Sequence, residues 1–330
     1  MKATAVANAN IALTKYWGKR DSKLMLPQNG SISMTLEGLN TTTTVEFSLN
    51  YEKDIVVIND QEVTDESEIK KVSDHLGIVR EMAGINEKAK VVSKNNFPTA
   101  AGLASSASGF AALSLAASKA VGLNLDNKEL SILSRRGSGS ATRSIEGGFV
   151  EWHRGEKEDG TDSFGEQIAP KDYWDFRMIT TIVSTEEKKV KSRAGMAQTI
   201  ATCPYYDKWL ATVGDDINVM RKAIKSKDFT TVGQTAEHNS LKMHATMITT
   251  KPPIIYWNPA TMSILHAIQD WREEDLESYF TMDAGPNVKV MCMAKDADEL
   301  KTRLEQLPGV KEAIICKPGD AAKIINEHLF

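Results

Sequence analysis

The most informative segment reads Pro98-Thr99-Ala100-Ala101-Gly102-Leu103-Ala104-Ser105-Ser106-Ala107-Ser108-Gly109, and it runs directly into Phe110-Ala111-Ala112-Leu113-Ser114-Leu115-Ala116-Ala117. Small residues let a backbone approach a ligand closely, and serine hydroxyls add hydrogen-bond donors. The helix expected to follow presents unpaired N–H groups with a partial positive charge at its start. The segment therefore predicts a phosphate-binding loop.

This loop differs from the common nucleotide P-loop, because no Gly-Lys-Ser/Thr ending closes it and it contains no lysine. Taken alone, it could equally be the start of a small-residue helix packed tightly in a core. Other segments of the chain decide between the two interpretations.

Chain length predicts two domains, since 330 residues exceed the size at which a single core usually stops growing. We expect an α/β domain over residues 1–183, which contains the phosphate loop, and an α+β domain over residues 184–330. We find no internal repeat or low-complexity linker, so the two halves are expected to pack closely around a ligand cleft.

The net charge of −4 opposes wholesale binding to nucleic acid or to a membrane. Any anion site must be a local cluster of basic residues. Three clusters qualify: Arg135-Arg136 with Arg143, Lys70-Lys71, and Lys188-Lys189-Val190-Lys191-Ser192-Arg193.

Cysteine usage indicates a reducing compartment. The three cysteines, Cys203, Cys292 and Cys316, are odd in number and widely spaced, which fits neither a disulfide framework nor a zinc site. No segment has the apolar run of a signal peptide or a membrane span. We therefore expect a cytoplasmic protein.

Hydrophobic patterning predicts an α+β fold. Residues 42–49 and 54–59 alternate in the manner of antiparallel strands, residues 66–83 have helical spacing before Gly84, and a short strand at 90–93 leads into the phosphate loop. A further helix is expected to open at Asp126. The remaining expected elements are a strand near 179–183, helices near 192–202, 205–226, 228–243 and 260–273, a strand–loop–strand pattern over 278–291, and a helix near 296–306.

Three further segments carry candidate chemistry. In residues 8–20 an apolar strand ends in Lys15-Tyr16-Trp17-Gly18-Lys19-Arg20, whose cations and tyrosine suit a phosphorylated substrate, although an edge strand with exposed lysines is the alternative. Residues 135–150 combine glycines, hydroxyls and Arg143 into a second anion cradle, for which a solvated turn is the alternative. In residues 280–288 Asp283 ends a predicted strand, where burial would require a cation beside it, unless the carboxylate simply caps a turn.

Together these segments resemble the mevalonate diphosphate decarboxylase family, within the wider group of small-molecule kinases related to galactokinase, homoserine kinase, mevalonate kinase and phosphomevalonate kinase. The resemblance spans nearly the whole chain. The phosphate loop is shared with the wider group, whereas Lys15-Tyr16-Trp17-Gly18-Lys19 and Met282-Asp283-Ala284-Gly285-Pro286-Asn287 are typical of the decarboxylases. The other matching motifs are Asn10-Ile11-Ala12, Gly137-Ser138-Gly139-Ser140 with Arg143-Ser144, Lys189-Val190, Ser192-Arg193 and Gly195-Met196.

The resemblance implies a two-domain small-molecule-kinase fold with the active site in the cleft between the domains. ATP would phosphorylate the C3 hydroxyl of mevalonate 5-diphosphate, and loss of phosphate and carbon dioxide would give isopentenyl diphosphate. The implied protein is an ATP-dependent carboxy-lyase of isoprenoid biosynthesis, acting in the mevalonate pathway as a homodimer.

The resemblance also implies residue roles. Asp283 would orient or deprotonate the hydroxyl, and Lys19 would hold Asp283 ionised, so that these two side chains should touch. Arg143 would clamp the substrate carboxylate. Lys19 and Arg143 would also bind the substrate. The other substrate-binding residues would be Tyr16, Ser138, Ser140, Ser192, Arg193 and Met196.

The implied ATP site centres on the phosphate loop. The phosphates and Mg²⁺ would be held by the loop hydroxyls and amides, with Ser106 as the metal candidate. The implied ATP-binding residues are Gly102, Leu103, Ala104, Ser105, Ser106, Ala107 and Ser108, with Ser93, Lys70, Lys71 and Lys188 as further candidates for nucleotide contacts.

Three alternatives remain open at this point. A kinase of the same group would stop at the phosphorylated alcohol, and a phosphomevalonate decarboxylase would act on the monophosphate instead of the diphosphate. A non-catalytic nucleotide or nucleic-acid binder would use the basic clusters, but it would not need an aspartate beside a lysine.

Overall fold

The computed structural model describes residues 1–97, 105–186 and 188–330, and its fold is α+β as predicted. β1 (Lys2–Thr14) and β4 (Ser31–Ser48) pair antiparallel at the centre of the larger sheet. The sheet order is β14-β1-β4-β7-β5-β6, and β8 and β9 extend it from β4. The other strands of this sheet are β5 (Ile55–Ile58), β6 (Gln61–Glu62), β7 (Lys88–Asn95), β8 (Phe149–Trp152), β9 (Gly165–Ala169) and β14 (Lys323–Ile325).

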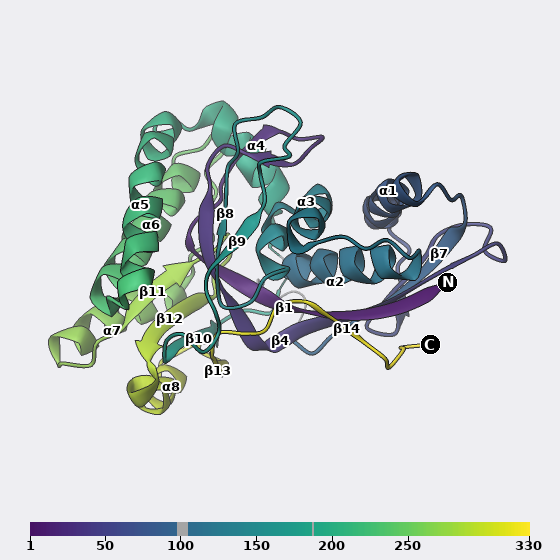
Figure 1. Ribbon diagram of the computed structural model, residues 1–330. Coiled ribbons are helices and arrows are strands. Elements are labelled where there is room, and N and C mark those ends of the chain that lie inside the picture. Colours follow the sequence, from purple (N-terminus) through teal and green to yellow (C-terminus); the bar gives the residue numbers. More distant parts are fainter. Residues whose placement is uncertain (98–104, 187) are drawn as a thin grey trace.

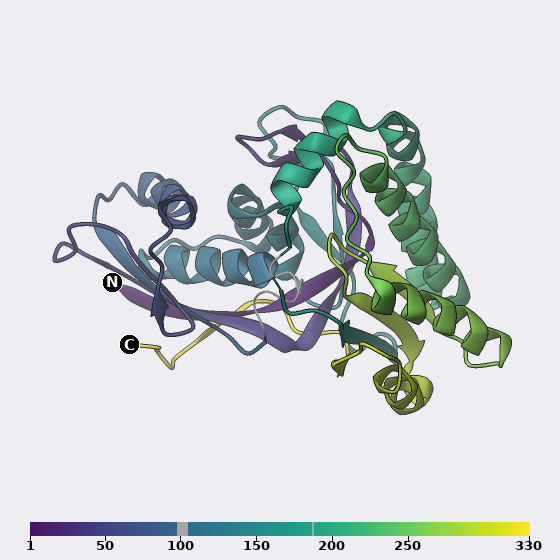
Figure 2. The same cartoon turned by 180° about the vertical axis from the view of Figure 1, so that it is seen from behind.

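Three helices cover one part of this sheet, and Figures 1 and 2 show them gathered on the same side of it. They are α1 (Glu66–Ala83), α2 (Ser105–Ala120) and α3 (Asn127–Gly137), and a 3-10 helix, η1 (Gly139–Ser144), follows α3. The helix starts follow from the sequence: Asp65 caps α1, and Asp126 caps α3 with a reciprocal bond from Glu129. Gly84 ends α1 in the left-handed conformation, as predicted.

The strands predicted over 42–49 and 54–59 are present, but they do not pair with each other. β7 lies between β4 and β5, and β5 runs parallel to β7. The expectation of antiparallel strands holds for β4 with β1 and β7 and for β5 with β6, and it is wrong for β5 with β7. The reason is that α1 carries the chain across the sheet between β5 and β7, and a helical crossover places two strands in parallel.

A second sheet has the order β11-β12-β10-β13. Its strands are β10 (Phe176–Ile182), β11 (Tyr279–Met282), β12 (Val288–Met293) and β13 (Glu312–Cys316). The helices of this half are α4 (Ser192–Thr202), α5 (Tyr206–Ser226), α6 (Phe229–Ile248), α7 (Pro259–Glu273), η2 (Ala294–Asp296) and α8 (Ala297–Glu305), close to the predicted ranges. A small ribbon is formed by β2 (Lys19–Asp21) and β3 (Leu26–Pro27).

The two halves share a core. One apolar cluster joins Ile11 and Met34 of the larger sheet to Met220 of α5, Met243 of α6 and Met291 of the second sheet. The last strand, β14, returns to pair with β1, so that the two chain ends lie near each other (Figure 1). None of the helices in the described ranges is both long enough and apolar enough to cross a bilayer.

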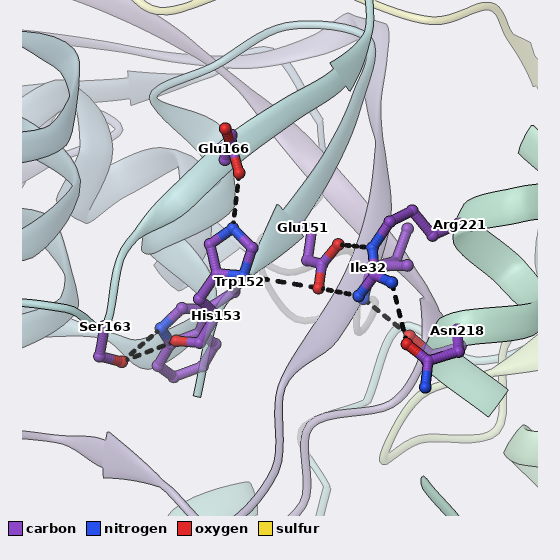
Figure 3. Close-up of polar contacts among 9 residues, drawn as sticks. Ile32, Glu151, Trp152, His153, Ser163, Glu166, Asn218 and Arg221 are labelled. Atoms are coloured by element: carbon purple, nitrogen blue, oxygen red, sulfur yellow. Dashed lines mark hydrogen bonds and ion pairs between the residues drawn. The ribbon is translucent and has the colours of Figure 1, made fainter. Parts of the chain in front are cut away.

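A half-buried ion pair attaches α5 to the larger sheet (Figure 3). Arg221 donates Nε and Nη2 to the two carboxylate oxygens of Glu151 on β8, at 2.5 and 2.6 Å. His153, directly after β8, contacts both Glu151 and Glu166. Trp152, between Glu151 and His153, donates Nε1 to Ser163 Oγ at 3.1 Å. This network fixes β8 and α5 relative to each other.

Arg221→Met tests the strength of this attachment. The Glu151 side chain is only 7% exposed, so removing its partner leaves a carboxylate out of water. We expect the free energy of unfolding in urea to fall by roughly 2 kcal/mol. The matched control is Arg303→Met, which breaks exposed pairs with Glu274 and Glu299 and is expected to leave the free energy of unfolding nearly unchanged. Equal losses in the two variants would contradict a special role for the half-buried pair.

Candidate active site

A cavity of about 460 Å³ lies where the two halves meet. Its walls come from the end of β1, the start of α2, η1, the segment before α4, and the turn after β11. Among the described residues, seven cationic side chains line it: Lys15, Lys19, Lys71, Arg143, Lys188, Lys191 and Arg193. The carboxylates lining it are Glu68 and Asp283. Because the protein as a whole has a net charge of −4, this local excess of positive charge indicates an anion-binding cavity.

Asp283 stands at the start of a tightly held turn between β11 and β12. Its carbonyl accepts from Gly285 N at 2.8 Å and from His244 Nε2 at 3.1 Å. The next carbonyls along the turn are also taken: Lys188 Nζ donates to Ala284 O, Thr261 Oγ1 to Pro286 O, and Lys289 Nζ to Asn287 O. The turn is therefore fixed by side chains from several different elements.

The Asp283 carboxylate pairs with Lys15, whose Nζ lies 2.8 Å from Oδ1. Enclosure by the cavity walls acts to raise the pKa of Asp283, but the positive charges of Lys15 and Lys289 overcome it and lower that pKa to about 2. Burial lowers the pKa of Lys289 to about 8, although Asp283 acts in the opposite direction. Asp283 is thus an ionised carboxylate held among cations.

Lys15 is fixed at three atoms. Its side chain is 2% exposed, and Nζ also donates to Ala12 O at 2.7 Å. Its backbone N–H donates to Asn239 Oδ1 of α6 at 2.7 Å, and its carbonyl accepts from Asn29 Nδ2. The ion pair therefore has a rigid cationic partner.

Arg143 lies deep in the cavity and is 3% exposed. It donates to Asn10 Oδ1 through Nε and Nη2 and to Ser31 Oγ through Nη1. Burial lowers its pKa to about 10, so the guanidinium stays charged near neutral pH. Asn10 is oriented by bonds from its Nδ2 to Ser140 O and Ser144 Oγ, which ties Arg143 to the Gly-Ser segment.

The Gly-Ser segment serves close packing. A side chain at Gly139 would meet the Trp152 ring at 2.8 Å and the Tyr16 ring at 3.1 Å. Glycine at this position lets the backbone lie against both rings. The hydroxyls of Ser138, Ser140 and Ser106 then lie within reach of one another, with Ser138 to Ser140 at 3.2 Å and Ser138 to Ser106 at 3.3 Å.

Tyr16 carries a hydroxyl that could donate a hydrogen bond to a ligand in the cavity. Its hydroxyl is buried, and no residue in the described ranges bonds to it. Burial raises its pKa, so the phenol stays protonated and can donate. A buried polar atom without a partner costs free energy, and an anion in the cavity would remove that cost.

Known proteins match this chain over nearly its whole length. Residues 7–165 match the model of the diphosphomevalonate decarboxylase-like N-terminal domain, and residues 178–323 match that of the mevalonate 5-diphosphate decarboxylase C-terminal domain. The chain belongs to the diphosphomevalonate decarboxylase family. The resemblance seen in the sequence is confirmed.

Individual members of the family agree in sequence and in fold. Diphosphomevalonate decarboxylase of Saccharomyces cerevisiae is 39% identical over 344 aligned residues, covering 99% of this chain and 85% of the yeast protein. A structure described as MDDEF in complex with MVAPP, AMPPCP and magnesium has a TM-score of 0.92 and 42% identity, with 98% and 99% coverage. Mevalonate diphosphate decarboxylase from Staphylococcus aureus has a TM-score of 0.92 and 39% identity, with 98% coverage of both chains.

The structure brings most of the expected site residues of this decarboxylase-family chain into the one cavity. The expected residues that line it are Tyr16, Lys19, Ser105, Ser106, Ser138, Ser140, Arg143, Lys188, Ser192, Arg193, Met196 and Asp283. Lys188 reaches Ser192 Oγ at 2.9 Å as well as Ala284 O, so it links the basic segment to the turn that carries Asp283.

One expected contact is wrong: Lys15, and not Lys19, touches Asp283. Gly18, with φ of 117°, turns the chain after Trp17, and Lys19 then pairs with Pro27 in the small ribbon. Lys19 still lines the cavity, but burial and the charge of Arg193 lower its pKa to about 8. Its binding role stays a prediction.

Other expected ATP-binding residues lie away from the cavity. Ser108 is buried and its Oγ lies 2.7 Å from Thr41 Oγ1, Ala107 is buried beside it, and Ser93 bonds to Thr43 across the β4–β7 ladder. Lys71 lines the cavity, whereas Lys70 pairs with Asp74 on an exposed face. Gly102, Leu103 and Ala104 lie outside the described residues. ATP contacts from these residues stay predictions.

The sequence predicted no individual catalytic or positioning role for Asn10, Lys15, His244 or Lys289, although Asn10 and Lys15 lie within its motifs. Asn10 and Lys15 did carry a signal, because each is a polar residue in or next to an apolar strand. Lys289 carried the same signal between two valines of β12. His244 had none, since nothing local distinguishes it from any other histidine on a helix.

Lys15→Met tests the assignment of the ion pair. The substitution keeps the volume of the side chain and removes its charge, so the pKa of Asp283 is expected to rise from about 2 to roughly 4 or higher. The measurement is a ¹³C NMR titration of carboxyl-labelled aspartate, with the Asp283 signal assigned by its loss in Asp283→Asn. Lys19→Met is the control and should leave the titration unchanged. The assignment is wrong if the pKa of Asp283 rises in Lys19→Met and stays unchanged in Lys15→Met.

Proposed function

We propose that this chain catalyses the ATP-dependent decarboxylation of mevalonate 5-diphosphate to isopentenyl diphosphate. The products released are ADP, phosphate and carbon dioxide, which makes the protein a carboxy-lyase of the mevalonate pathway. The observation that carries the proposal is the ionised Asp283 in a cavity where, among the residues that the structure describes, seven cationic side chains face two carboxylates. A substrate with a diphosphate and a carboxylate, together with ATP, supplies the missing negative charge.

Arg143 is proposed to hold the substrate carboxylate, with Asn10 as the residue that orients its guanidinium. The guanidinium can fork onto two oxygens, and its bonds to Asn10 and Ser31 fix its plane before the substrate arrives. The diphosphate is assigned to the groups on the other side of the cavity. These are Tyr16, Lys19, Ser138, Ser140, Ser192 and Arg193, with Met196 as an apolar contact.

Asp283 is proposed to orient the C3 hydroxyl and to take its proton as the γ-phosphoryl group of ATP bonds to the hydroxyl oxygen. A carboxylate with a pKa of about 2 is a weak base, so its main contribution is position. Phosphoryl transfer depends on alignment and on charge stabilisation more than on base strength.

The second step breaks two bonds. The C3–O bond cleaves and phosphate leaves with its electron pair, so positive charge develops at C3. The bond between the carboxylate carbon and C2 then supplies the electrons of the new double bond, and carbon dioxide departs. Arg143 contributes by holding the carboxylate in the orientation that this fragmentation needs.

The ATP phosphates are assigned to the start of α2, to Ser105 and Ser106, and to Lys71 and Lys188. These hydroxyl, ammonium and helix N-terminal groups are all donors, which fits a polyanion. Mg²⁺ would be held by the phosphates with Ser106, and its charge would offset theirs during transfer. A member of the family with an ATP analogue and magnesium bound supports this assignment.

Three broader expectations belong to the same proposal. We propose a homodimer, a cytoplasmic location, and two domains divided before β10 rather than at residue 183, because β10 (Phe176–Ile182) lies in the second sheet. The reduced, buried state of Cys203, Cys292 and Cys316 supports the location. Sedimentation equilibrium would test the dimer.

Substrate comparison tests the function directly. Purified protein with ATP and Mg²⁺ is given mevalonate 5-diphosphate or mevalonate 5-phosphate, and ADP and carbon dioxide are measured together. We expect equal amounts of both products with the diphosphate and kcat/KM at least tenfold lower with the monophosphate, because the diphosphate-binding groups lose a partner. ADP without carbon dioxide would indicate a kinase. Preference for the monophosphate would indicate a phosphomevalonate decarboxylase.

Asp283→Asn tests the role of the carboxylate. The amide keeps the shape but cannot take a proton or pair with Lys15, so kcat is expected to fall by roughly 10³-fold. Dissociation constants for both substrates, measured by calorimetry, should change by less than about fivefold. A melting curve shows whether the unpaired Lys15 has destabilised the fold. Near-normal turnover would refute the catalytic assignment.

A further inference from the structure

His244 lies on α6, close to its end, and it is 1% exposed. Its Nε2 is 3.1 Å from the backbone carbonyl oxygen of Asp283. A carbonyl oxygen only accepts, so the imidazole carries its proton on Nε2 and donates it. Burial lowers the pKa of His244 to about 3, which keeps the ring neutral at the pH values of an assay.

The ring has a fixed orientation. It packs against Trp257 with the centroids 5.2 Å apart, and edge-on against Tyr256 at 6.5 Å. Tyr256 is itself anchored, because its hydroxyl donates to Val190 O at 2.8 Å. The direction in which Nε2 points is therefore set by packing before any substrate binds.

The helix that carries His244 is also fixed against the second sheet, beside which it lies in Figures 1 and 2. Gly233 of α6 sits directly against the Tyr279 ring of β11, where a side chain would collide with it. The same helix supplies Asn239, which accepts from the backbone N–H of Lys15. α6 thus holds the backbone on both sides of the Lys15–Asp283 pair.

From this geometry we infer that His244 is a positioning residue for the reaction: by donating to the Asp283 carbonyl, it sets where the Asp283 carboxylate stands relative to Lys15 and the substrate hydroxyl. The inference rests on the proposed function and deepens it. His244 touches the backbone of Asp283, so it acts on the reaction through that residue. Its contribution is to the alignment on which phosphoryl transfer depends.

The test compares two substitutions. His244→Phe keeps a planar ring in the packing site and removes the donor. His244→Gln places an amide N–H near the position of Nε2 and restores the donor. His75→Phe is the matched control, because His75 is also buried and bonds to Ser114 Oγ at 2.9 Å, between α1 and α2.

We expect His244→Phe to lower kcat by roughly 10- to 100-fold, with KM for ATP and for mevalonate diphosphate within about threefold of wild type. His244→Gln should recover kcat to within about threefold of wild type, and His75→Phe should match wild type. The inference is overturned if His244→Phe keeps kcat within twofold. It is also overturned if the phenylalanine and glutamine variants lose kcat equally, because the effect would then come from packing.

A second readout does not depend on turnover. The Asp283 carboxyl signal in the ¹³C titration should move to a higher pH in His244→Phe, because the carboxylate separates from Lys15, and should stay in place in His244→Gln. If wild-type protein fails to release carbon dioxide, the proposed function fails while this titration still decides the positioning role. An unchanged titration in His244→Phe would count against the inference.

Discussion

The 2.8 Å ion pair between Lys15 and Asp283 joins the end of a strand in one sheet to a turn at the end of a strand in the other. Removing two charges from water costs several kcal/mol per ion, and their attraction offsets that cost only when further hydrogen bonds support the pair. Here Ala12 O and Asn239 support Lys15, and His244 supports the backbone of Asp283. The pair can form only if both sheets and α6 are correctly placed.

Before anions bind, the Lys15–Asp283 pair stabilises the site, whereas the excess of positive charge in the cavity destabilises it. Lys289 and Lys19 both have a lowered pKa because burial disfavours their charged forms and a neighbouring cation adds to the effect. The protein therefore folds with a site that is electrostatically unfavourable until anions fill it. Relief of that repulsion adds to the binding free energy of the anionic substrates, which ties binding to the geometry of the filled site.

Local chemistry in the sequence predicted the helices well. Asp65 and Gly84 bound α1, and Asp126 with Glu129 opens α3, because capping depends on residues a few positions apart. Which strands lie next to each other in a sheet does not follow from such local signals. The insertion of β7 between β4 and β5 is decided by where α1 packs, a long-range contact without a local pattern.

In the site, too, local signals predict some features and long-range contacts decide the others. The motifs predicted Arg143, Asp283 and the hydroxyls of Ser138 and Ser140 as site residues, and all of them line the one cavity. Such a prediction is possible because the type of a polar side chain limits the chemistry that it can carry out. The choice between Lys15 and Lys19 could not be made from spacing. Lys15 directly follows β1 and Lys19 begins β2, and the turn at Gly18 together with the bond from Lys15 N–H to Asn239 decides which one points to Asp283.

Base strength and position make different demands on a catalytic carboxylate. A strong base needs a raised pKa, which here would require removing Lys15 and Lys289 from the neighbourhood of Asp283. The structure does the reverse, and it uses uncharged groups such as His244 and Thr261 to hold carbonyls of the turn. In a phosphoryl transfer with little charge on the attacking oxygen, alignment contributes more than basicity. The side chains that fix this turn are therefore as much a part of the site as the charges that line it.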